Sequence, residues 1–73
     1  MHKSCQHPTY GLIEYDENFF TGSKSLSING VKLQKAKKDT FVWSNGENKE
    51  LVSLSGNVVF GVTVFIRDEK ISF

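Results

Sequence analysis

The segment Ser25-Leu-Ser-Ile-Asn-Gly-Val-Lys-Leu-Gln34 carries the clearest local structural signal in the sequence. Apolar and polar side chains alternate on both sides of Asn29-Gly30, which is the period of a β-strand with one buried face. A two-residue type I′ turn needs positive φ at both central residues, and asparagine and glycine tolerate this best. The segment therefore predicts a β-hairpin in which Ile28 pairs with Val31.

Short apolar runs bounded by turn residues continue on both sides of this hairpin. Asn45-Gly46 predicts a second turn, either with Ser44 paired to Glu47 or with a longer loop through Asn48. No segment of ten or more residues has apolar residues at the 3.6-residue spacing of an amphipathic helix. The pattern predicts an all-β fold, a small antiparallel β-sandwich or a partly open barrel of six to seven short strands. The expected strands are residues 10–16, 25–28, 31–34, 40–44, 51–54, 58–66 and 71–73.

The same alternation assigns a hydrophobic core. Residues 58–66 are apolar on both faces, which indicates either a central strand or a face that is covered by a partner. Gly61 within this run indicates a bulge or a close backbone approach. The predicted core residues are Leu12, Leu26, Ile28, Val31, Leu33, Phe41, Trp43, Leu51, Leu54, Phe60, Val62, Val64 and Ile66.

Length and composition limit the chain to one small domain. Its 73 residues are too few for two independent cores, and we expect a flexible leader over residues 1–9 and a single all-β domain over residues 10–73. The single cysteine, Cys5, excludes an internal disulfide and a four-thiolate zinc site. No apolar run approaches the length of a membrane span, so we expect none in this chain.

The charge balance bears on the partner. Nine Lys and Arg residues against eight Asp and Glu residues leave a formal net charge of +1. Dedicated nucleic-acid-binding domains are usually strongly basic, so nucleic acid is not the expected partner. The expected partner is a protein of unknown identity or a second copy of the chain.

Both histidines and the cysteine lie within the first seven residues. His2, Cys5 and His7 supply imidazole and thiolate groups, which bind zinc and can also form a nucleophile–base pair. Their spacing matches no closed structural zinc site, and no flanking sequence indicates a rigid scaffold. We therefore expect neither a metal ion nor a catalytic residue in this segment.

Three carboxylates lie close together at Glu14, Asp16 and Glu17. Carboxylates are natural ligands for hard cations, but this spacing lacks the glycine-centred loop of a calcium hand. A solvated strand edge explains the cluster better. The sequence predicts no cofactor and no enzymatic activity, although a small metal- or carboxylate-dependent enzyme remains an alternative.

The predicted binding residues are an aromatic pair and a group of lysines. Phe19 and Phe20 cannot both point inward from a regular strand, so either both rings are buried at a bend, or one plugs the sandwich and the other contacts a partner. If the hairpin register continues, Lys24 lies opposite Lys35, and Lys37 shares its face. These lysines either meet an anionic partner or protect a strand edge from association.

Four segments resemble a small all-β domain of uncharacterised bacterial proteins, in which membrane segments often follow the domain. They are Gly-Leu-Ile-Glu-Tyr-Asp-Glu-Asn-Phe-Phe-Thr-Gly at 11–22, Ile-Asn-Gly-Val-Lys-Leu at 28–33, Ser-Gly-Asn at 55–57 and Gly-Val at 61–62. The resemblance covers about residues 10–73, but Phe20 departs from the pattern, which has a tryptophan nearby. It implies a soluble module beside a membrane anchor and transfers no catalytic residue.

These features predict a non-catalytic binding or interaction module, the soluble head of a larger bacterial protein. A self-associating structural module is the first alternative, because residues 58–66 offer two apolar faces. The second alternative is the small enzyme described above.

Overall fold

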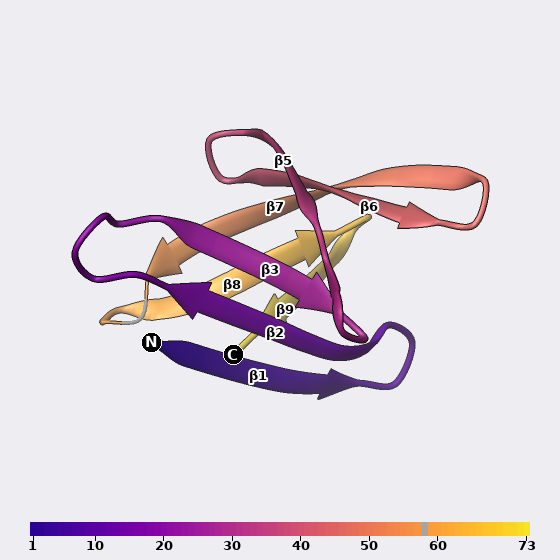
Figure 1. The fold of residues 1–73 in the computed structure, drawn as a ribbon. Coiled ribbons are helices and arrows are strands. Elements are labelled where there is room, and N and C mark those ends of the chain that lie inside the picture. The colour runs from indigo at the N-terminus through magenta and orange to yellow at the C-terminus, as the bar shows by residue number, and fades with distance from the viewer. Residues whose placement is uncertain (58) are drawn as a thin grey trace.

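The computed structural model describes residues 1–57 and 59–73, and in this part of the chain it contains nine strands and no helix (Figure 1). β1–β4 form one antiparallel sheet and β5–β9 form another, and within each sheet every strand pairs with the next in sequence. The arrangement is sandwich-like and confirms the predicted all-β class. The strands are β1 (His2–His7), β2 (Gly11–Glu17), β3 (Lys24–Ile28), β4 (Val31–Lys32), β5 (Gln34–Lys37), β6 (Thr40–Asn45), β7 (Asn48–Asn57), β8 (Gly61–Ile66) and β9 (Glu69–Ser72).

The turn at Asn29-Gly30 forms as predicted. The φ angle is 51° at Asn29 and 81° at Gly30, and positive φ at both central residues is typical of a type I′ turn. Ile28 pairs with Val31 across the turn. A strictly local signal was sufficient here, because the turn residues and the flanking alternation agree.

The second predicted turn is shifted by one residue. Asn45 pairs with Asn48, so Gly46 and Glu47 are the two central residues. Gly46 has a φ of 65°, and glycine at the first central position is typical of a type II′ turn. The predicted pairing of Ser44 with Glu47 is therefore wrong.

The chain crosses from the first sheet to the second at Leu33. The N–H of Leu33 donates a hydrogen bond to the carbonyl oxygen of Leu26 at 2.9 Å, and β5 then pairs with β6. The predicted strand over residues 31–34 is thus divided into β4 and β5. Because the chain bends here, Lys24 does not lie opposite Lys35, as the continued hairpin register had predicted.

The prediction of a flexible leader over residues 1–9 is wrong. β1 occupies His2–His7 and pairs antiparallel with β2, with Cys5 opposite Ile13. Exposed and half-buried side chains alternate along β1, which is an edge strand, and His2, Ser4 and Gln6 lie on its solvent side. Backbone pairing satisfies N–H and C=O groups whatever the side chains are, and a polar sequence therefore does not prevent it.

The hydrophobic core lies between the two sheets. Tyr15, Val64 and Ile66 are completely buried within it. Tyr10, Ile13, Tyr15, Val52 and Ile71 belong to the core although the sequence analysis did not assign them to it. The full set of buried hydrophobic residues is Tyr10, Ile13, Tyr15, Leu26, Ile28, Leu33, Phe41, Val52, Leu54, Val62, Val64, Ile66 and Ile71.

Five predicted core residues lie elsewhere: Leu12 and Trp43 are half-buried, and Val31, Leu51 and Phe60 are exposed. Successive residues of a strand point to opposite faces. In β7, Val52 and Leu54 take the inner face, which leaves Leu51 outside. Phe60 lies in the turn before β8 rather than in a strand, and Val58, the first residue of the predicted strand, lies outside the described residues.

Asn29 ties two turns together at one end of the first sheet. Its Oδ1 accepts a hydrogen bond from the N–H of Leu12 at 2.9 Å, and its Nδ2 donates one to the carbonyl oxygen of Tyr10 at 3.2 Å. We expect Asn29→Ala to lower the free energy of unfolding by about 2 kcal/mol, because it removes two hydrogen bonds and places alanine at positive φ. Urea denaturation measures the change. Asn45→Ala, at an exposed position beside the other turn, is the control, and an equal loss in both variants would contradict the prediction.

Candidate functional site

The turn between β2 and β3 carries two aromatic rings on its surface. The Oδ1 of Asn18 accepts hydrogen bonds from the N–H groups of Phe20 at 2.9 Å and Thr21 at 3.3 Å. An asparagine side chain that accepts such bonds stabilises a turn. Phe20 is 100% exposed and Phe19 is 62% exposed. Both rings therefore lie on the surface, and neither is buried at a bend or plugs the sandwich.

A second turn of the same construction joins β7 to β8. The Oδ1 of Asn57 accepts hydrogen bonds from the N–H groups of Val59 at 2.9 Å and Phe60 at 3.0 Å, and both apolar side chains are exposed. The ammonium group of Lys24 donates a hydrogen bond to the carbonyl oxygen of Gly56 at 3.2 Å. Since Lys24 begins β3 and Gly56 lies near the end of β7, the two turns lie at the same end of the molecule (Figure 1).

Met1 lies at this end as well. Its backbone amino group donates a hydrogen bond to the carbonyl oxygen of Glu17 at 2.6 Å, and its side chain is exposed. We define the apolar tip as the exposed residues Met1, Phe19, Phe20, Val59 and Phe60. Val59 and Phe60 were predicted to lie within a strand and were therefore not identified as surface residues. Asn57, placed like Asn18 just ahead of apolar residues, was the signal for a turn.

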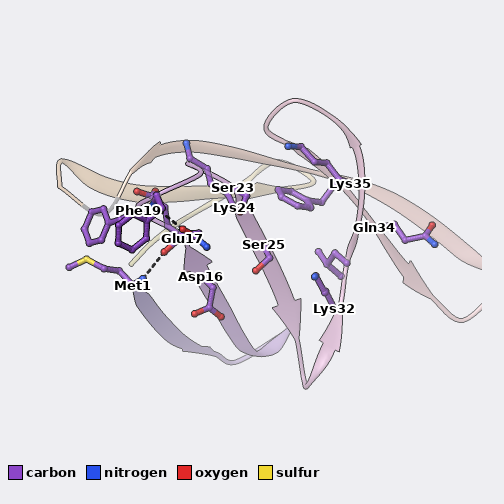
Figure 2. A pocket seen from close by; sticks show the side chains of 14 residues that line it. Met1, Asp16, Glu17, Phe19, Ser23, Lys24, Ser25, Lys32, Gln34 and Lys35 are labelled. Atoms are coloured by element: carbon purple, nitrogen blue, oxygen red, sulfur yellow. Dashed lines mark hydrogen bonds between the residues drawn. The ribbon is translucent and has the colours of Figure 1, made fainter.

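An open groove begins beside the apolar tip and extends to the bend between β4 and β5 (Figure 2). Its volume is about 1100 Å³. The buried side chains of Leu33 and Phe41 contribute to its lining, and the exposed side chains of Lys32 and Lys35 lie at the end away from the tip. We call this feature the β3–β5 groove.

The lysines of the groove differ in how their charges are satisfied. The Nζ of Lys24 lies 3.9 Å from Asp39 Oδ1, in addition to its hydrogen bond with Gly56, so its charge links the two sheets. Lys32 and Lys35 are exposed, and neither forms an ion pair within residues 1–57 and 59–73. Asp16 and Glu17 also line the groove, but Asp16 contacts His2 and Glu17 accepts a hydrogen bond from Tyr15. The charged groups of the groove that are left for an incoming molecule are therefore the ammonium groups of Lys32 and Lys35.

The structure brings most of the predicted binding residues together. Phe19, Phe20, Lys24 and Lys35 all line the β3–β5 groove. Lys37 is exposed but does not line it, since the register of β5 shifts between Lys35 and Lys37. Lys24 and Lys35 were predicted to face each other across a regular hairpin. In the structure they line one groove because the chain bends at Leu33, between β4 and β5.

The three neighbouring carboxylates do not form one site. His2 lies between Glu14 and Asp16, with its Nε2 3.4 Å from Glu14 Oε2 and its Nδ1 3.1 Å from Asp16 Oδ1. Glu17 accepts a hydrogen bond from the hydroxyl group of Tyr15. Burial raises the pKa of Tyr15 above its usual value, and the Glu17 carboxylate raises it further. Glu14 and Asp16 thus share His2 as a partner, whereas Glu17 is bound to Tyr15.

The side chains of β1 are separated by strand geometry. His2 points to the exposed face, whereas Cys5 and His7 point to the other face. Cys5 packs against the core. The Nε2 of His7 lies 3.0 Å from Glu69 Oε2, while its Nδ1 accepts a hydrogen bond from the N–H of Thr9 at 3.0 Å. Among the described residues, no group of three His, Cys, Asp or Glu side chains is arranged to hold a metal ion.

The fold defines the chain as a small antiparallel β-sandwich whose strands follow one another in sequence order. No protein-family model, curated protein or solved structure matches it. None of the described residues belongs to a helix of the length and apolar character that a membrane span requires. The resemblance to a bacterial domain stays a prediction.

Proposed function

We propose that the protein is a non-catalytic binding module whose contact surface is the apolar tip together with the β3–β5 groove. The proposal is carried by the exposure of the tip: Phe20 is 100% exposed and Phe60 is 88% exposed. Single exposed apolar residues are ordinary, but apolar residues gathered on neighbouring turns are typical of an interaction surface. The proposed partner is a protein.

The way in which the rings are held supports recognition. Asn18 and Asn57 each fix their turn by two hydrogen bonds, so Phe20 and Phe60 lose little backbone freedom when a partner covers them. Preorganised contacts reduce the entropic cost of association. Aromatic side chains are also among the residues that contribute most to binding when a partner's pocket encloses them.

Lys32 and Lys35 add an electrostatic component beside the apolar tip. Exposed charges next to an apolar contact chiefly affect the association rate and the choice of partner. Aromatic rings beside lysines that form no ion pair are suited to binding a partner protein. We assign no bond-making step to any of these residues.

Site-specific photo-cross-linking tests the proposal. Phe20→benzoylphenylalanine and Lys35→benzoylphenylalanine are expected to give adducts after irradiation in the native host cells, because both positions lie on the proposed contact surface. Lys49→benzoylphenylalanine is the matched control, since Lys49 is exposed on the β6–β7 hairpin away from the tip (Figure 1). Gel electrophoresis and mass spectrometry measure the yield and identify the adducts.

The outcomes separate the proposal from its alternatives. Adducts that form several-fold more from positions 20 and 35 than from position 49 would support a partner at the proposed surface. An adduct with twice the mass of the chain would identify self-association as the function of this surface. Equal yields at all three positions would contradict the proposal.

A further inference from the structure

The edge of β3 that faces the groove is open over its first residues. β4 pairs only with Ser27 and Ile28, and the hydrogen bond from Leu33 N–H to the carbonyl oxygen of Leu26 is the last link before the chain bends away. Residues two apart on a strand direct their N–H and C=O groups to the same side. The backbone groups of Lys24 therefore face the same side as the carbonyl of Leu26, beyond the end of β4.

β5 provides the opposite wall of the opening. It is an edge strand of the second sheet and pairs with β6 along one side. Figure 1 shows β3 and β5 diverging from the bend between β4 and β5, and residues of both strands line the groove. Unpaired edges of this kind are templates for an added strand.

The side chains that line the groove include both apolar and charged groups. Leu33 and Phe41 are buried and supply apolar lining, while Lys32 and Lys35 are exposed and form no ion pair in the described part of the chain. An extended peptide can meet both kinds of lining, because its successive side chains point to opposite faces. Apolar residues on one face and carboxylates on the other would match the two kinds of lining.

We propose that the β3–β5 groove binds an extended acidic segment of a partner protein, which adds as a strand to the open edge of β3. This inference rests on the proposed function and names its class of partner. Backbone hydrogen bonds to Lys24 and to the N–H of Leu26, whose carbonyl already accepts from Leu33, supply affinity, and Lys32 and Lys35 select carboxylates, as in other modes of strand addition. A second copy of the chain is disfavoured in this groove because its own edge carries the same unpaired lysines.

The volume of the groove agrees with such an occupant. Small-molecule sites enclose roughly 300–1,000 Å³, and this groove, at about 1100 Å³, is larger and open to solvent. The apolar tip lies at one end of it, where Phe19 and Phe20 would cover the end of the added strand. The proposed contact is therefore continuous with the surface proposed above.

Titration with a synthetic peptide tests the inference. The probe is a capped peptide of about seven residues in which glutamate alternates with valine, followed by calorimetry and by amide exchange in NMR spectra. We expect binding and slower exchange at the amides of Lys24 and Leu26. N-methylation of alternate peptide amides, in the register that faces β3, is expected to weaken binding by about tenfold, because backbone hydrogen bonds are lost at unchanged charge.

A charge-reversal pair supplies the side-chain test. Lys32→Glu with Lys35→Glu is expected to weaken peptide binding by at least about tenfold. Lys49→Glu with Lys70→Glu, two exposed lysines away from the groove, is the matched control and is expected to bind like the original chain.

Two results would overturn strand addition. The first is failure of the peptide to bind. The second is equal affinity for peptides that are methylated in either register, together with unchanged exchange at the amides of Lys24 and Leu26. If cross-linking from position 20 persists in either case, the binding function stands and only the class of partner is wrong. If that cross-linking is absent too, both proposals fail.

Discussion

Gly56→Ala is expected to lower the free energy of unfolding by about 3–5 kcal/mol, among the largest effects of any single substitution in this chain. Gly56 has a φ of 85°, which L side chains rarely adopt, and a Cβ there would lie 2.0 Å from the carbonyl oxygen of Gly61. That oxygen belongs to the neighbouring strand, so β7 and β8 would have to separate where Gly56 pairs with Val62. Urea denaturation followed by circular dichroism measures the loss.

Gly46→Ala is the matched control for this effect. Gly46 also has a positive φ, 65°, but no atom lies within 4 Å of the position that its Cβ would occupy. Its substitution therefore isolates backbone strain, which costs about 1–2 kcal/mol. If the two variants lost the same stability, steric contact with the neighbouring strand would not be the cause.

Tyr15→Ala is expected to destabilise the fold by about 3–5 kcal/mol, because it deletes a large, completely buried ring and leaves a cavity between the sheets. A chain of this size has a stability of only a few kcal/mol, so much of the variant should be unfolded at room temperature. Tyr15→Phe keeps the ring and loses only the hydrogen bond to Glu17, and about 1 kcal/mol is expected. Comparable losses in the two variants would contradict this account of the ring.

The same hydroxyl group gives the fold a dependence on alkaline pH. Burial, followed by the hydrogen bond to Glu17, raises the pKa of Tyr15 in the folded state, whereas in the unfolded chain the hydroxyl ionises near its usual pKa of about 10. Its contribution to stability is therefore fully present below pH about 10 and decreases as the pH rises toward the folded-state pKa. Urea midpoints of Tyr15→Phe should depend less on pH in this range than those of the original chain.

Local patterns were sufficient to predict the fold class, and tertiary interactions determined where the prediction was wrong. The Asn29-Gly30 turn depends on two adjacent residues and on the alternation of apolar and polar residues beside them, so it can be predicted from the local sequence. No local sequence pattern predicts the bend at Leu33, because the bend depends on the pairing of β5 with β6. Edge strand β1 also escaped prediction, since its pairing uses backbone groups that every residue except proline supplies in full.

The candidate site could be predicted only in part for the same reason. Phe19 and Phe20 were identified because they cannot share the inner face of a strand, and both are exposed. Val59 and Phe60 were missed because an apolar run of strand length does not reveal where its turn ends. The proximity of Lys24 to Gly56 depends on residues 32 positions apart, which a local pattern does not encode.

The order of the strands has a consequence for how the protein is made. Each sheet is assembled from strands that follow one another in the chain, so during translation a newly emerged strand finds its pairing partner already synthesised. Low separation between contacting residues favours rapid folding, even among all-β proteins. The contact between His7 and Glu69 joins β1 to β9, and it forms only after the ribosome has delivered β9.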